Sequence, residues 1–170
     1  GTFPFVDIKT YWELTKRLDK GLIMKVLNHP SRFLKAETFK DCDNTKESFY
    51  KSARKYARSE REEDRMVREL DRLFRLITML KGASPVKFCK ILLNVYYLDW
   101  IDDYSNFMKV DGKMIRESLK LLQDEAEYFT TMADWISYAE EYPALIAEKS
   151  KAKGGVTLST FHGAKGLEWK

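Results

Sequence analysis

SEREEDRMVRELDRLFRLITMLKG, residues 59–82, is the stretch that best indicates the fold class of this chain. Apolar side chains recur in it every three or four residues, the spacing of one face of an α-helix. They are Met66, Leu70, Leu73, Phe74, Ile77 and Leu80. Ser59 followed by Glu62 has the pattern of a capping box, and Gly82 suits a helix C-terminus. We therefore predict a long amphipathic helix here, with its apolar face in a core.

Similar helical spacing extends to both sides of this stretch. The predicted helices cover 8–18 with Asp7 as N-cap, 22–27 ended by Pro30, 49–57 behind Thr45, 85–95 from Ser84-Pro85, 115–122 after Gly112, and 131–143 with Pro143 as a kink or end. The only glycines between Gly21 and Gly154 are Gly82 and Gly112, so this stretch has few residues that break helices. These features predict an all-α, irregular helical bundle over residues 1–150.

Residues 145–170, the last 26 of the chain, differ in kind from the rest. Residues 145–155, LIAEKSKAKGG, are small and basic and predict a flexible linker, whose boundaries we set at 151–155. Residues 156–161, VTLSTF, predict a short buried strand. Because a lone strand has unpaired edges, we expect its sheet to lie outside these 170 residues. The chain is thus expected to be a piece of a larger protein.

Composition excludes several classes of function. The formal net charge of +4 permits a nucleic-acid partner without requiring one. Cys42 and Cys89 are too few for a disulfide framework or a four-cysteine zinc site. The sequence has no apolar run long enough to span a membrane and no secretory signal pattern, so we expect a cytoplasmic protein. It also lacks a GxxxxGK[ST] phosphate loop, so we expect no catalytic residue and no metal site in this chain.

Residues 156–169, VTLSTFHGAKGLEW, resemble motif V of the UvrD/Rep-type superfamily 1 DNA helicases, V-x-L-x-T-x-H-x-A-K-G-L-E-[FW]. In that family a helical insertion, subdomain 2B, precedes motif V within the second RecA-like domain. Residues 26–32, VLNHPSR, resemble a V-x-N-x-P-x-R segment early in the same subdomain. The resemblance implies that residues 1–150 are the helical accessory subdomain 2B, 151–155 a linker and 156–170 a truncated motif V segment.

The resemblance also implies a function for the parent protein. The parent would be an ATP-dependent 3′-to-5′ DNA helicase of bacterial replication or repair that uses ATP and Mg²⁺, while this chain alone would hold no cofactor and catalyse nothing. In motif V, Thr160, His162 and Lys165 would contact single-stranded DNA, and Gly166 and Glu168 would contact the nucleotide. The helical part would regulate the motor, contact duplex DNA and bind a repair or replication protein.

Two basic runs suggest where duplex DNA could bind, residues 32–35 (RFLK) and 51–58 (KSARKYAR). The candidate phosphate contacts are Arg32, Lys35, Lys51, Arg54, Lys55 and Arg58. The chain departs from the family at residues 33–35, where Phe-Leu-Lys replaces a common Gly-Ile-Gly. Two alternatives stay open: a protein-interaction module without a DNA role, and the matching subdomain of an AddA/RecB-like helicase–nuclease.

Overall fold

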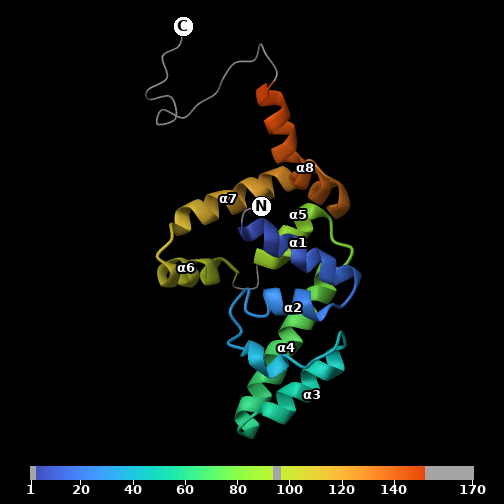
Figure 1. The fold of residues 1–170 in the computed structure, drawn as a ribbon, viewed down its shortest axis with the longest axis vertical. Helices are drawn as coiled ribbons and strands as arrows, with labels where there is room; N and C mark the ends of the chain where they lie inside the picture. The colour runs from blue at the N-terminus through green and yellow to red at the C-terminus, as the bar shows by residue number, and fades with distance from the viewer. Residues whose placement is uncertain (1–2, 94–96, 152–170) are drawn as a thin grey trace. The chain divides into compact units, whose positions relative to one another are not determined.

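The computed structural model describes residues 3–93 and 97–151, and the regular structure of these residues is helical (Figure 1). The elements are α1 (Phe3–Lys16), α2 (Lys20–Val26), the 3₁₀ helix η1 (Ala36–Phe39), α3 (Lys46–Tyr56), α4 (Glu60–Leu80), α5 (Pro85–Leu93), α6 (Tyr97–Met108), α7 (Gly112–Ala126) and α8 (Met132–Lys151). The chain divides into two compact units, Gly1–Trp135 and Ile136–Lys170. The all-α class is confirmed for the part of the chain that the structure describes.

Helix α4 is the main support of the first unit, where it contacts α1, α3 and α5. The predicted apolar face is buried, and Leu76 joins it. At the start of α4, the Ser59 hydroxyl accepts the Glu62 N–H at 3.2 Å, as predicted. The Glu62 carboxylate accepts the N–H of Arg58 at 2.9 Å, one residue before the position that a capping box would use. After α4, Gly82 adopts φ +72°, a left-handed conformation that favours glycine.

Asp7 is not the N-cap that the sequence predicted. Helix α1 begins at Phe3, so Asp7 lies inside it, and its side chain is buried. Its carboxylate accepts the Tyr97 hydroxyl at 2.6 Å and contacts His29 Nδ1 at 3.1 Å. The side chain therefore joins α1 to α6 and to the loop after α2, because a buried carboxylate needs donors and the fold supplies them.

Two further predictions are corrected near the middle and end of the chain. Helix α6 was not predicted, although Tyr97, Trp100 and Ile101 on it are buried. Helix α8 continues past Pro143 to Lys151, so residues 145–151 are helical rather than part of a linker. A proline removes one backbone donor, but the Ala, Leu and Glu residues that follow favour helix continuation. The predicted strand at 156–161 lies outside the described residues.

Among the described residues, no helix combines the length and the apolar character that crossing a bilayer requires.

Candidate nucleic-acid interface

The loop between α2 and η1 is closed by a single side chain, that of Asn28. Its amide nitrogen donates to the Leu34 carbonyl at 2.8 Å. Its amide oxygen accepts the backbone N–H of Leu34 at 3.0 Å and that of Arg32 at 3.3 Å. These three bonds fix residues 28–34 as one compact turn. They also occupy the Leu34 amide, so this N–H group is not free to bind another molecule.

Arg32 anchors the same turn from within and is not a surface cation. Its side chain is buried, and Nη1 donates to the carbonyls of Val26, Leu27 and Pro30 at 3.0–3.1 Å. Nη2 donates to the Tyr11 hydroxyl at 3.1 Å. A guanidinium held in this way does not face solvent, so the proposed contact between Arg32 and DNA phosphate is corrected to a structural role.

Burial alternates with exposure along residues 32–35. Arg32 and Leu34 point into the core, whereas Lys35 is exposed and the Phe33 side chain is 81% exposed. Phe33 also has φ +52°, in the left-handed region that is unusual for a residue with a bulky side chain. The guanidinium of Arg65, from α4, donates to the carbonyls of Phe33 at 3.1 Å and Arg32 at 3.5 Å. The loop therefore holds Phe33 outward on a fixed backbone.

Beside this loop lies a basic hollow of about 270 Å³, between η1, the end of α3 and the start of α4. It is lined by Lys35, Glu37, Thr38, Lys40, Tyr56, Arg58, Glu62, Arg65 and Met66. Four cations face two carboxylates there, which leaves a net charge of +2 by formal count. Glu37 hydrogen-bonds Lys40 at 2.6 Å and raises the pKa of that ammonium group. A cationic hollow of this kind can bind phosphate groups.

The second basic run has different surroundings. Lys51 and Lys55 line another hollow together with Asp41, Asp43 and Glu47, so carboxylates outnumber ammonium groups there by three to two. Hydrogen bonds from Thr45 and Ser48 lower the pKa of Asp43, which keeps this carboxylate charged.

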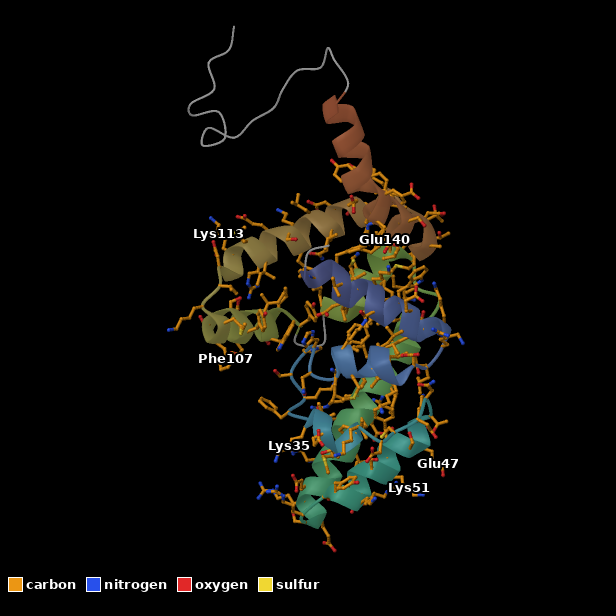
Figure 2. All side chains as sticks on the ribbon, in the orientation of Figure 1. Lys35, Glu47, Lys51, Phe107, Lys113 and Glu140 are labelled. Atoms are coloured by element: carbon orange, nitrogen blue, oxygen red, sulfur yellow. The ribbon has the colours of Figure 1, made fainter. Side chains whose placement is uncertain are left out.

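Arg54 also has a carboxylate partner, because its Nε lies 3.7 Å from Glu63. Figure 2 shows Lys35 and Lys51 on opposite sides of the lower part of the first unit. The structure thus brings Lys35 and Arg58 together at the basic hollow and separates Lys51 from them.

The five motif V residues, Thr160, His162, Lys165, Gly166 and Glu168, lie outside the described residues. In the described ranges, His, Cys, Asp and Glu side chains form no cluster of three or more that could hold a metal ion.

Sequence reasoning missed three residues of this surface: Asn28, Phe33 and Arg65. Asn28 lies in residues 26–32, singled out for the family resemblance, and Phe33 lies in the basic run 32–35, but their roles depend on the loop conformation. Arg65 lies on α4, whose helical pattern in the sequence is clear. The spacing of residues along a helix, however, does not show that the Arg65 side chain reaches a loop 32 residues away.

Comparison of this chain with protein-family models, with curated proteins and with solved structures finds no match in any of the three.

Proposed function

We propose that this chain is the helical accessory subdomain 2B, with an adjoining motif V segment, of a UvrD/Rep-type ATP-dependent 3′-to-5′ DNA helicase. The observation that carries the proposal is the ungapped similarity of residues 156–169 to motif V. The proposal assigns ATP, Mg²⁺ and catalysis to the RecA-like domains of the parent, since this sequence has no phosphate loop. The role of the helical part is to contact duplex DNA and regulate the motor.

The second resemblance, over residues 26–32, gains support from how the fold uses those positions. Val26 is buried, Asn28 closes the loop and Arg32 bonds three carbonyls. The positions that define the V-x-N-x-P-x-R pattern thus include those that shape the loop between α2 and η1. That loop lies next to the basic hollow, which offers Lys35 and Arg58 to DNA phosphates.

A binding experiment with a fluorescent duplex of about 20 base pairs tests the DNA role. If two to four cations of the basic hollow displace counterions, affinity falls by about 10- to 150-fold between 50 and 200 mM salt. Binding through phosphates is also independent of base sequence, so duplexes of unrelated sequence have equal affinities. Fluorescence anisotropy of the 170-residue chain measures both properties.

A matched pair of charge reversals locates the contact. The double variant Lys35→Glu/Arg58→Glu is expected to lose most of the duplex affinity. The double variant Lys87→Glu/Lys90→Glu changes the net charge equally at exposed positions of α5 and is expected to retain affinity. Equal losses in the two variants, or no binding at low salt, would count against a DNA contact at the basic hollow.

One observation favours a second candidate function, protein interaction. Around the turn between α6 and α7, Phe107 is 83% exposed and Met114 68% exposed, and Met108 and Val110 are about half exposed. Figure 2 labels Phe107 at the outer end of α6. Four exposed apolar side chains within eight residues of the chain suit a site that meets another protein. The second function that we propose for this chain is therefore to bind a partner protein of the helicase.

A further inference from the structure

The most unusual exposed side chain of the first unit is Phe33. A bulky residue in left-handed conformation normally moves to another backbone conformation, at a gain of about 1–2 kcal/mol. Here the Asn28 side chain accepts the backbone N–H groups of Arg32 and Leu34, on both sides of Phe33, and Arg65 donates to the Phe33 carbonyl. The buried side chains of Arg32 and Leu34 flank the exposed ring, so the ring cannot turn inward without withdrawing them. The fold thus tolerates a left-handed backbone at Phe33 and presents its ring to solvent.

The surroundings of the ring are cationic and include a second aromatic side chain. Lys35 follows Phe33 in the chain, and Arg65 bonds the Phe33 carbonyl. Both cations line the basic hollow, as does Tyr56, which is 44% exposed. The Lys55 ammonium lies 4.9 Å from the centre of the Tyr56 ring. A ligand that complements this surface therefore carries negative charges at short intervals, with flat apolar groups beside them.

We propose that Phe33 is a stacking residue for an unpaired base of single-stranded nucleic acid, whose phosphates enter the basic hollow beside it. Unpaired nucleotides combine the two features that this surface selects, because each carries one phosphate and one exposed aromatic face. In a continuous duplex the base faces are covered, so duplex phosphates alone give the Phe33 ring no partner. The inference rests on the proposed DNA role of the basic hollow and adds to it a preference for unpaired bases.

The test compares two oligonucleotides of equal length, a dT oligomer and an abasic oligomer that has the same phosphates and no bases. Phe33→Ala is expected to lower affinity for the dT oligomer by about 5- to 150-fold, the range that stacking on one base gives. Affinity for the abasic oligomer is expected to stay unchanged. Phe33→Trp, which keeps an aromatic face, is expected to restore dT affinity.

Two controls separate stacking from damage to the loop. Phe33→Asn suits the left-handed backbone, so its midpoint of urea unfolding is expected not to fall while its preference for dT is lost. Phe107→Ala removes an equally exposed ring distant in sequence from the basic hollow and is expected to leave dT affinity unchanged. A lower unfolding midpoint in Phe33→Asn would show that the ring supports the fold, and would overturn the proposal.

The remaining outcomes distinguish this inference from the proposed function. If the chain binds duplex with steep salt dependence but Phe33→Ala leaves dT affinity unchanged, the stacking proposal fails and the duplex role stands. Equal losses on dT and abasic oligomers would also overturn it, because phosphate contacts then account for the effect. If neither duplex nor single strand binds at low salt, both proposals fail together.

Discussion

Arg32 and Lys35 show how different the roles of two nearby basic residues can be. Both belong to one basic run, yet Arg32 is buried under four hydrogen bonds and Lys35 faces the solvent. The difference depends on Tyr11, which lies 21 residues earlier in the chain and receives one of the Arg32 bonds. A run of charges indicates electrostatic potential, but it does not show which side chain the tertiary structure will bury.

We expect Arg32→Met to lower the free energy of unfolding by about 2–5 kcal/mol. The substitution keeps an unbranched aliphatic stem but leaves the carbonyls of Val26, Leu27 and Pro30 without this donor. Arg32→Lys is also expected to destabilise the fold, because an ammonium cannot reproduce the planar fork. Urea unfolding followed by circular dichroism measures both changes.

The matched control for Arg32 is Lys35→Met, which removes an exposed cation and is expected to change stability by at most about 0.5 kcal/mol. The proposed DNA contact at the basic hollow predicts that Lys35→Met weakens duplex binding more than Arg32→Met does. Full stability in Arg32→Met would contradict the anchoring role assigned to this guanidinium.

At the scale of elements, the residues after α4 allow the effect of backbone conformation on stability to be measured by itself. Gly82 adopts φ +72°, and a Cβ placed there would meet no atom within 4 Å. Gly82→Ala is therefore expected to cost about 1–2 kcal/mol through left-handed strain alone. Gly82→Asn is expected to cost less, because asparagine tolerates this conformation. Thermal unfolding measures the loss in each variant, and an equal loss in both would contradict left-handed strain as the cause.

The helices that could be predicted from the sequence share two local signals, regular apolar spacing and a capping residue. Helices α3 and α4 have both, with Thr45 and Ser59 as caps. Helix α6 has neither signal clearly, since Asp, Ser and Asn interrupt its aromatic residues and are poor helix formers. Its stability comes from burial of Tyr97, Trp100 and Ile101, which local sequence does not reveal.

The candidate site was predictable to a smaller extent than the helices. Lys35 and Arg58 were identified by charge, and the structure places both at the basic hollow. The exposure of Phe33 could not be predicted, because apolar residues in a short loop are usually buried and its orientation follows from side-chain bonds made by Asn28. Two acidic neighbours of Lys51, Asp41 and Asp43, come from the segment before α3, and only the fold brings them to this side chain.

At the scale of the whole molecule, long-range polar contacts connect helices that are distant in sequence. The Tyr97 hydroxyl donates to the Asp7 carboxylate across 90 residues, and the His29 ring contacts both Asp7 and Trp100. The loop that carries Phe33 begins next to His29. Packing of α1 and α6 therefore helps to set the loop conformation. Substitutions at Asp7 or Tyr97 are expected to change the stability of the entire first unit.

Cysteine and tyrosine side chains whose pKa values are raised in the fold make stability depend on pH in the alkaline range. Burial raises the pKa of the Cys89 thiol from 9.0 to about 12, and burial together with Asp71 raises the pKa of Tyr50 from 10.0 to about 12. Burial and the adjacent Asp7 also raise the pKa of Tyr97. In each case the folded state retains a proton that the unfolded chain releases at lower pH. The stability from these groups is thus complete below pH 9 and declines as the pH rises towards 12.

We therefore expect the free energy of unfolding, measured by urea titration, to be nearly constant from pH 7.5 to 8.5 and to fall between pH 9 and 11. For the buried thiol alone the slope is at most about 1.4 kcal/mol per pH unit. Cys89→Ala lowers stability at neutral pH through lost packing, but it removes the thiol titration, so its curve should be flatter from pH 9 to 10. A parent curve that stays level to pH 11, or a variant curve parallel to it throughout, would show that these groups are as accessible to water in the folded chain as in the unfolded one.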